Sequence, residues 1–298
     1  MGACAAACPF CYTDWIRRDP PFETPQLLRI IDRIVSDFPT VGRVVLSGGE
    51  VTEFVDIVGV ARYARSAGLR VAIQTNGIQM HSRSFTHALG QSGGVDAFLV
   101  SLHSIQPEIH DSILGIPAAF EKTTLGIANA LAEGAAVSTN TVICRSTISG
   151  LVDLVEYCVD RFSPLETMRF SNIIVEGAAF RNANGLLVSL DNVAHVAIRL
   201  RGVGEKLGVH IELANVPLCI DPQGSLNSSY HVDLQRALID FSPFYQQNRP
   251  RGEKYVKPAR CSECTLLRQC PGIQSAYLSW AKSVPESIIP VPGASDCG

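Results

Sequence analysis

The chain of 298 residues lacks several features that would place it in particular classes of protein. No apolar run approaches the length of a membrane-spanning helix, so we expect no membrane-embedded part. Lysine and arginine (25) nearly balance aspartate and glutamate (28), and the net charge of −3 offers no basic surface for nucleic acid. There is no internal repeat, no low-complexity segment and no charged-then-apolar leader, so the expected compartment is the reducing cytoplasm.

The bulk composition is that of an ordinary soluble α/β enzyme, with 46% hydrophobic and 18% charged residues. The length allows one large domain and an appendage. Cysteine is the exception, because seven of the ten cysteines fall in two groups with the spacing of metal ligands. Two others, Cys144 and Cys158, lie in apolar patterns and are predicted to be buried packing residues.

The first group is the triplet Cys4, Cys8 and Cys11, spaced Cys-x3-Cys-x2-Cys. It supplies three thiolates from one short loop, one fewer than a complete 4Fe-4S cluster needs, and so leaves one iron open to a ligand. This triplet resembles the signature of the radical SAM enzymes. The resemblance implies that S-adenosylmethionine (SAM) chelates the open iron. An electron from a flavodoxin- or ferredoxin-type reductant would then cleave SAM to a 5′-deoxyadenosyl radical, which abstracts hydrogen from a substrate.

The second mark of this family is the stretch Gly48-Gly49-Glu50, which follows a short β-branched run. Two glycines at the end of a strand let the backbone approach a ligand closely, and a carboxylate can pair with an ammonium group. Seen alone, the stretch is a common turn with a solvated acid. The resemblance implies that it contacts the amino group of the methionine moiety of SAM.

Weaker marks follow the next strands, at residues 74–77 and 101–104. They are similar to the Thr-Asn-Gly and Ser-Leu-Asp-Gly segments that line the SAM site in relatives of the molybdenum-cofactor cyclase and the peptide-maturing enzymes. His103 stands in place of the usual aspartate, which leaves its role open. Asn140 and Arg145 are either SAM contacts by the same analogy or a strand-end cap and a surface cation. The SAM-binding residues implied are Gly48, Gly49, Glu50, Thr75, Asn76, Ser101, His103, Asn140 and Arg145.

Helices and strands alternate from residue 24, where Thr24 is predicted as the N-cap of a helix with Pro25 at its first position. Repeated β-α units predict parallel strands with right-handed crossovers and a site at the carboxyl ends of the strands. Strands are expected near 43–47, 70–75, 97–102, 137–143, 167–174 and 209–213, and helices near 52–67, 82–90, 117–133, 148–162, 189–207 and 232–246.

The expected fold class is α/β, a partial (β/α)6 TIM-like radical SAM barrel over residues 1–208, as the resemblance implies. Such barrels begin with a strand ahead of the cluster loop, and only three residues precede Cys4. We therefore expect the first strand to be missing, either because the gene model is truncated or because this copy has lost it. A lost strand would leave an exposed sheet edge and a poorly anchored loop.

The second cysteine group is Cys261, Cys264 and Cys270, spaced Cys-x2-Cys-x5-Cys, with Cys219 upstream as a fourth thiolate. Taken alone, four thiolates suit structural zinc and an iron–sulfur cluster about equally. Behind a radical SAM triplet, the stretch resembles the auxiliary-cluster region of SPASM or twitch-type enzymes. Residues 209–298 are therefore expected to form a small cysteine-rich extension with one auxiliary 4Fe-4S cluster, and Cys297 is expected to be a bystander.

The function expected from this resemblance is that of a radical SAM oxidoreductase or maturase. A peptide is the first choice of substrate by analogy, with a small metabolite close behind. The motifs do not choose among oxidation, cross-linking and epimerisation, and they name no general acid or base. The alternative from another class is a non-catalytic iron–sulfur or zinc-binding scaffold, or an electron-transfer protein, built on a degenerate barrel.

Overall fold

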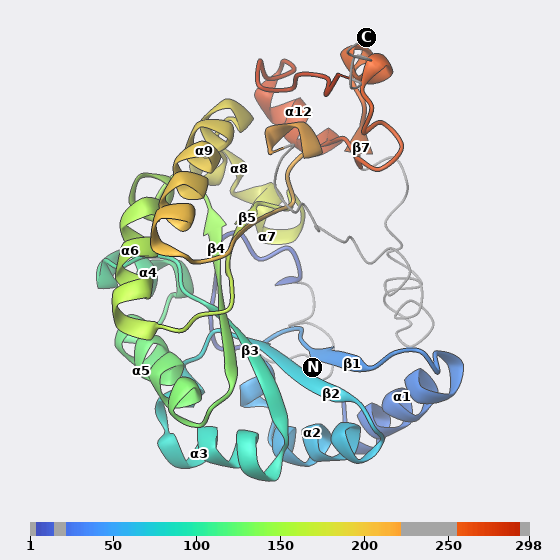
Figure 1. Ribbon diagram of the computed structural model, residues 1–298, viewed down its shortest axis with the longest axis vertical. Helices are drawn as coiled ribbons and strands as arrows, with labels where there is room; N and C mark the ends of the chain where they lie inside the picture. Colours follow the sequence, from blue (N-terminus) through green and yellow to red (C-terminus); the bar gives the residue numbers. More distant parts are fainter. Residues whose placement is uncertain (1–3, 15–21, 222–254, 293–298) are drawn as a thin grey trace.

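The computed structural model describes residues 4–14, 22–221 and 255–292. Its main feature is a sheet of six parallel strands that pair in chain order. Helices cover the outer face of this curved sheet (Figure 1). The architecture confirms the predicted α/β class. The strands are β1 (Arg43–Leu46), β2 (Arg70–Thr75), β3 (Val95–Ser101), β4 (Ala136–Ile143), β5 (Met168–Asn172) and β6 (Ile211–Ala214).

The helices that connect the strands pack on the sheet through apolar faces. They are α1 (Thr24–Asp37), α2 (Ile57–Ser66), α3 (Arg83–His87), α4 (Pro107–Leu114), α5 (Ala119–Ala132), α6 (Leu151–Phe162), α7 (Gly177–Arg181), α8 (Ala183–Leu186) and α9 (Leu190–Leu207). A C-terminal region with a short hairpin, β7 (Tyr255–Val256) and β8 (Ile273–Gln274), and the helix α12 (Ser275–Ala281) lies at the top in Figure 1, beyond α7.

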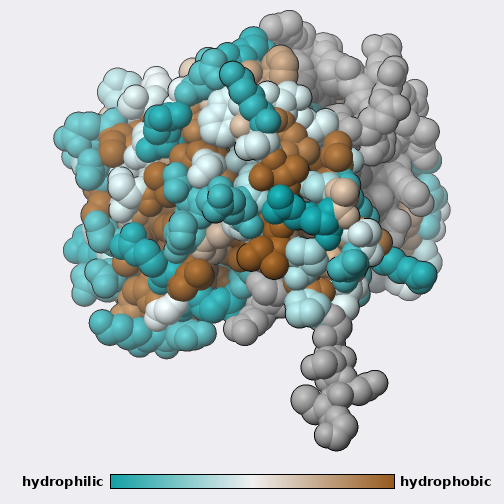
Figure 2. All heavy atoms as spheres, turned by 90° about the horizontal axis from the view of Figure 1, so that it is seen from above, coloured by the Kyte–Doolittle hydropathy of each residue, from teal (hydrophilic) through white to brown (hydrophobic). Residues whose placement is uncertain are grey.

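The core lies between the sheet and the helices, and the strand pattern explains why. Along β2, Val71 and Ile73 are fully buried on the helix side, whereas Ala72 and Gln74 on the other side are only half-buried. Each fully buried aliphatic side chain contributes about 1.5–3 kcal/mol of transfer free energy. Seen from above, the surface is a mixture of hydrophobic and hydrophilic residues (Figure 2).

Two helix starts differ from the sequence-based expectation. The N-cap of α1 is Glu23 rather than Thr24, and its backbone N–H donates to the Oε1 atom of Gln26 at 2.8 Å. The helix expected from residue 52 begins only at Ile57. A 3₁₀ turn (Val51–Glu53) precedes it, because the side chain of Glu50 accepts the N–H of residue 52 and so fixes that turn.

Helix α4 adds to the expected pattern, and helix α9 confirms the helix expected near 189–207. We did not predict α4, although Pro107 at its first turn and the left-handed Gly115 at its end are ordinary helix signals. Helix α9 runs its full length in spite of Gly204. A Cβ atom at that position would lie 2.4 Å from Cγ1 of Ile211, so the glycine lets α9 lie close against β6.

The edge of the sheet is formed by β1, whose Val45 is 54% exposed. Within residues 4–14 and 22–42 no strand precedes it. The sheet still has six strands because β6, in the segment assigned to the C-terminal extension, pairs with β5. The division at residue 208 stays a prediction. The helix expected at 232–246 and Cys297 lie outside the described residues, and none of the helices described is long and apolar enough to cross a membrane.

Candidate functional site

The N-terminal cysteine loop, residues 4–14, carries three half-buried cysteines that form no disulfide, Cys4, Cys8 and Cys11. The Sγ atom of Cys11 lies 3.6 Å from the hydroxyl of Thr13, and Sγ of Cys4 lies 3.7 Å from the carbonyl oxygen of Ala6. All cysteines of the described ranges are free thiols, which agrees with a set of ligands rather than a disulfide framework.

Backbone hydrogen bonds from three different elements hold this loop against the barrel. The carboxylate of Glu53, in the 3₁₀ turn after β1, accepts from the N–H of residue 5 through both oxygens, at 3.0 and 3.2 Å. The carbonyl of Leu114 at the end of α4 accepts from the N–H of residue 7 at 2.7 Å. On the far side, Ala178 N in α7 donates to Cys11 O at 3.0 Å. These hydrogen bonds anchor the loop to three elements of the described chain.

Apolar contacts complete the anchoring of the loop. Ala6 is buried in a small cluster of its own with Ile78, Ile113 and Leu114, and Cys4 and Cys8 pack against it. The ring of Phe10 meets the ring of His103 edge-on, with centroids 5.2 Å apart. The triplet thus lies at the carboxyl edge of the sheet, where the predicted SAM residues also lie.

Glu50 is the hub of that edge. It is 3% exposed, and its carboxylate accepts four hydrogen bonds. These come from Thr52 N (3.0 Å), Thr52 Oγ1 (2.7 Å) and Thr75 Oγ1 (2.6 Å) to Oε1, and from Asn76 N (2.7 Å) to Oε2. Four hydrogen bonds to one carboxylate fix its position and orientation. Glu50 thereby ties the end of β1 to the end of β2.

The groups beside Glu50 fit a small polar ligand. Gly48 and Gly49 adopt φ values of +96° and +57°, a left-handed conformation that glycine adopts without strain. Asn76 is 9% exposed, and its Oδ1 accepts from the N–H of residue 78 at 2.9 Å. Its Nδ2 is buried and has no partner in the described structure. Such a donor costs about 1–3 kcal/mol until a ligand accepts from it. These residues fit the amino-acid end of SAM.

Polar side chains continue along the neighbouring strands. The register of β3 and β4 places Ser101 beside Asn140, and Oδ1 of Asn140 accepts from the hydroxyl of Ser171 on β5 at 2.6 Å. Asn140 is buried and Ser101 half-buried. The predicted residues Glu50, Thr75, Asn76, Ser101 and Asn140 therefore lie on consecutive strands at one edge, as parallel topology requires.

His103 lies beneath the cysteine loop and is 3% exposed. Its Nδ1 accepts from Val142 N at 3.4 Å, and its own backbone N–H donates to Nδ1 of His110 at 3.2 Å. Burial, and then the neighbouring His110, lower the pKa of His103 to about 3. Burial lowers the pKa of His110 to about 4, against the opposing effect of Asp111. Both imidazoles are therefore neutral at neutral pH.

Arg145 has a different setting from the other predicted residues. Its guanidinium donates to the carbonyl of Asn184 at 3.3 Å and to that of Leu187 at 3.5 Å, and its backbone N–H donates to Leu186 O. These bonds tie the loop after β4 to α8. A contact of Arg145 with ribose or carboxylate stays a prediction.

The second cysteine group comes together from two distant segments. Cys219, in a 3₁₀ turn (Leu218–Ile220), and Cys261, Cys264 and Cys270 line one pocket with aliphatic side chains. Burial, and then Cys270, raise the pKa of Cys219 to about 11. Burial and the neighbouring thiols also raise the pKa of Cys261. Close thiols of this kind resist ionisation unless a metal or cluster takes up their charge.

Backbone groups are already aimed at two of these sulfurs. Leu218 N donates to Sγ of Cys270 and Val291 N donates to Sγ of Cys264, each at 3.4 Å. Sulfur donors alone suit zinc or iron–sulfur clusters. In the described ranges no group of three or more His, Cys, Asp or Glu side chains is placed to hold a metal ion, so ligation by either cysteine group is a proposal.

Several residues of the site had no signal that we recognised in the sequence. Thr52 gives Glu50 two hydrogen bonds, and the rings of Phe10 and His110 both lie close to the ring of His103. The position of Thr52, two residues after Glu50, is the one signal that was available.

Curated relatives match between about half and two thirds of the chain. AdoMet-dependent heme synthase of Oleidesulfovibrio alaskensis is 25% identical over 158 residues, which are 52% of this chain and 40% of that protein. Probable GTP 3′,8-cyclase of Methanothermobacter marburgensis is 31% identical over 160 residues, 53% of this chain and 51% of the relative. PqqA peptide cyclase of Ruegeria pomeroyi is 27% identical over 208 residues, 67% of this chain and 54% of the relative. The chain thus spans about half the length of these relatives or less.

Solved structures share the fold over more of the chain. Streptococcus suis SuiB bound to S-adenosylmethionine covers 97% of this chain and 74% of its own, with a TM-score of 0.66 and 15% identity. Native anSMEcpe with bound AdoMet covers 71% of this chain and 61% of its own, with a TM-score of 0.56 and 15% identity. At these identities the likeness shows the fold.

The family itself is shown by sequence. The family model described as Radical SAM superfamily matches residues 1–158, more than half of the chain. This match contains the cysteine triplet and the Gly-Gly-Glu stretch as well as the strands up to β4. Together with the geometry at the carboxyl edge of the sheet, it establishes that the chain belongs to the radical SAM superfamily.

Proposed function

We propose that this protein cleaves SAM reductively at a 4Fe-4S cluster held by Cys4, Cys8 and Cys11 and uses the radical to abstract hydrogen from a substrate. When bound, the cluster supplies the electron that breaks a carbon–sulfur bond of SAM. The observation that carries the proposal is the position of three half-buried cysteines at the same sheet edge as Glu50 and Nδ2 of Asn76, a buried donor without a partner.

The chain's own residues then bind and orient SAM. Oε2 of Glu50 accepts one hydrogen bond, from Asn76 N, and has capacity for an ammonium proton. Nδ2 of Asn76 supplies a donor for a carboxylate. Because Glu50 is locked by its other donors, these groups are in position before SAM arrives, which lowers the entropic cost of orienting it.

We further propose that Cys219, Cys261, Cys264 and Cys270 hold one auxiliary 4Fe-4S cluster. The support is that all four thiols, from segments about forty residues apart, line one apolar pocket with N–H groups directed at two of the sulfurs. Four thiolates saturate a cubane, so this cluster would exchange electrons or shape the substrate site without binding SAM.

The substrate class that we favour is a peptide. SuiB has been solved bound to the precursor peptide SuiA and anSMEcpe with the peptide Kp18Cys, and PqqA peptide cyclase is named for one. The heme synthases and GTP cyclases are named for small molecules, which makes a small metabolite the second candidate. A flavodoxin- or ferredoxin-type protein is the proposed reductant.

The test is anaerobic reconstitution of the chain with iron and sulfide, followed by dithionite and SAM. The proposal predicts about eight irons per chain, two 4Fe-4S clusters, and release of 5′-deoxyadenosine. About four irons with cleavage would remove the auxiliary cluster and keep the radical reaction. Iron without any cleavage would favour the non-catalytic scaffold, and zinc in place of iron would favour a structural C-terminal site.

A further inference from the structure

Residues 173–178, which connect β5 to α7 and include the first two residues of α7, lie beside the C-terminal region. We name them the bridge segment. The side-chain amide of Gln274 makes two hydrogen bonds to the bridge segment. Its Oε1 accepts from Val175 N at 2.8 Å, and its Nε2 donates to Ile173 O at 2.9 Å. These contacts join residues 99 and 101 positions apart in the chain. Gln274 is 8% exposed, so both atoms of its amide are used in a buried setting.

The other end of the bridge segment touches the N-terminal cysteine loop. Ala178 N donates to the carbonyl of Cys11, the last ligand of the triplet. Gly177 makes this approach possible, because a Cβ atom there would lie 2.9 Å from Cys11 O and 2.5 Å from Oδ1 of Asp14. The loop therefore rests directly on the bridge backbone.

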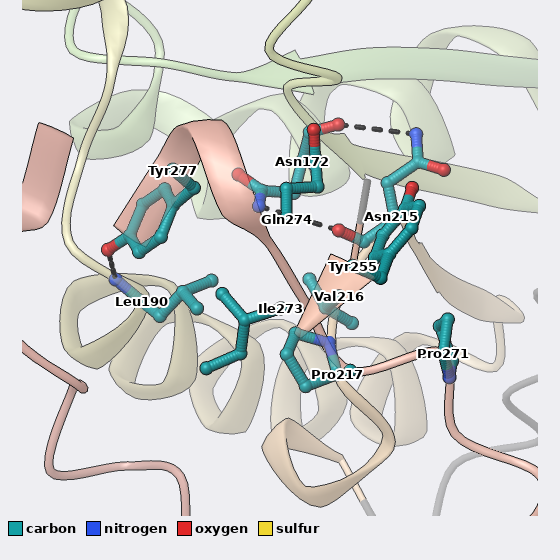
Figure 3. Close-up of a pocket in the computed structure, with 11 residues that line it drawn as sticks. Asn172, Leu190, Asn215, Val216, Pro217, Tyr255, Pro271, Ile273, Gln274 and Tyr277 are labelled. Atoms are coloured by element: carbon teal, nitrogen blue, oxygen red, sulfur yellow. Dashed lines mark hydrogen bonds between the residues drawn. The ribbon is translucent and has the colours of Figure 1, made fainter. Parts of the chain in front are cut away.

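Gln274 is also close, along the chain, to the second group of thiols. It follows Cys270 by four residues and belongs to β8, which pairs with β7 in the hairpin beside that pocket. Figure 3 shows Gln274 next to Asn172, the last residue of β5, with Ile273 and Pro271 lining the same pocket. One amide thus connects the C-terminal thiols to the backbone on which the N-terminal loop rests.

We infer that Gln274 is a positioning residue that sets the placement of the C-terminal cysteine group relative to the triplet, acting through the bridge segment. The inference rests on the proposed function, in which each group holds a cluster. A fixed separation matters there, because electron exchange between two clusters depends steeply on distance. One path of backbone and hydrogen bonds runs from Cys11 through residues 178–175 to Gln274 and Cys270.

Other contacts keep the C-terminal region docked when this amide is changed. The hydroxyl of Tyr277 accepts from Leu190 N at 2.7 Å (Figure 3), and Ser287 N donates to a carboxylate oxygen of Asp191 at 2.7 Å. Both bonds go to α9 rather than to the bridge. A Gln274 variant is therefore expected to fold and to lose the link to the bridge alone.

The experiment compares Gln274→Met, which removes both hydrogen bonds at similar volume, with Gln274→Glu, which keeps the acceptor for Val175 N. The control is Ser279→Ala, an exposed α12 position whose hydroxyl bonds only within its helix. The reconstituted proteins are measured by hydrogen–deuterium exchange and, after reduction, by the magnetic interaction between the two clusters. Gln274→Met is expected to speed amide hydrogen exchange in residues 173–178 and 4–14 about fivefold to tenfold. It is also expected to broaden the distribution of magnetic interaction strengths between the two clusters.

Gln274→Glu is expected to show a smaller change of the same kind, and Ser279→Ala none. Unchanged exchange in residues 4–14, together with a wild-type magnetic interaction, would overturn the inference. If the methionine variant does not accumulate, the glutamate variant decides. If the wild-type chain holds only about four irons, the auxiliary cluster is refuted. The hydrogen exchange of residues 4–14 in the variants then decides whether Gln274 positions the N-terminal cysteine loop.

Discussion

The two cysteine groups differ in number of thiols, in setting and in what fixes them. The N-terminal loop offers three thiols at the sheet edge. The hydrogen-bonded carboxylate of Glu50 and the Nδ2 atom of Asn76, which has no partner, lie at the same edge. The C-terminal group offers four thiols in an aliphatic pocket away from such polar groups. Three sulfurs leave an iron for a ligand and four do not. This difference supports the proposal that the first group acts on SAM and that the second holds a closed cluster.

The largest expected effect comes from removing one thiol of the triplet. Cys8→Ala is expected to lower the iron content from about eight to about four per chain and to abolish release of 5′-deoxyadenosine. The control Cys158→Ala, which removes a buried thiol outside both groups, is expected to keep both clusters. Iron and sulfide assays with product analysis measure the outcome. A Cys8→Ala protein that still cleaves SAM would contradict the assignment.

Removing a thiol of the second group tests the proposed auxiliary cluster separately from SAM cleavage. Cys264→Ala is expected to lose about four irons as well, but to keep SAM cleavage by the remaining cluster. The same assays apply, with cleavage expressed per remaining cluster. Loss of cleavage on a par with Cys8→Ala would show that the two groups act as one site.

Replacement of the Glu50 carboxylate by an amide is expected to have a smaller effect than loss of a cysteine. Glu50→Gln places an amide N–H₂ against groups that all donate hydrogen bonds, and should cost about 2–3 kcal/mol of folding free energy and weaken SAM binding. Urea unfolding and equilibrium dialysis of SAM measure this. Glu108→Gln, at an exposed site on α4, is expected to stay within about 0.5 kcal/mol of wild type. Equal stability of the two variants would show that the Glu50 bonds contribute little.

A further prediction concerns acid sensitivity beneath the N-terminal loop. His103 and His110 have folded-state pKa values of about 3 and about 4, below the unfolded value of about 6.5. The unfolded chain therefore binds more protons between pH 6.5 and 4. The free energy of unfolding therefore decreases as the pH is lowered through that window, by up to about 1.4 kcal/mol per pH unit for each histidine.

Urea midpoints between pH 7.5 and 5 test this. The slope is expected to be shallower in His110→Asn, in which Oδ1 can replace Nδ1 as acceptor for His103 N. The exposed His195 on α9 provides the control His195→Asn, which should keep the wild-type slope. Parallel slopes in all three proteins would contradict the assignment of acid sensitivity to the buried pair.

Local signals in the sequence predicted much of the fold. Strand ends at residues 46, 75 and 101 were readable because β-branched runs meet Gly, Asn or Ser there, and parallel topology then gathers those ends. The sequence did not predict the start of α2 at Ile57. That start depends on the hydrogen bond from Thr52 N to the side chain of Glu50, which forms a 3₁₀ turn in place of the first helical turn. The role of Gln274 depends on contacts about a hundred residues away, which no local pattern carries.

The most direct test of the account is electron paramagnetic resonance of the reduced, reconstituted protein with and without SAM. The account predicts two cluster signals, of which SAM changes only one. The signal that responds should be absent in Cys8→Ala, and the unresponsive one should be absent in Cys264→Ala. A SAM response that survives in Cys8→Ala and disappears in Cys264→Ala would contradict the central claim that the three-thiol loop is the site of SAM.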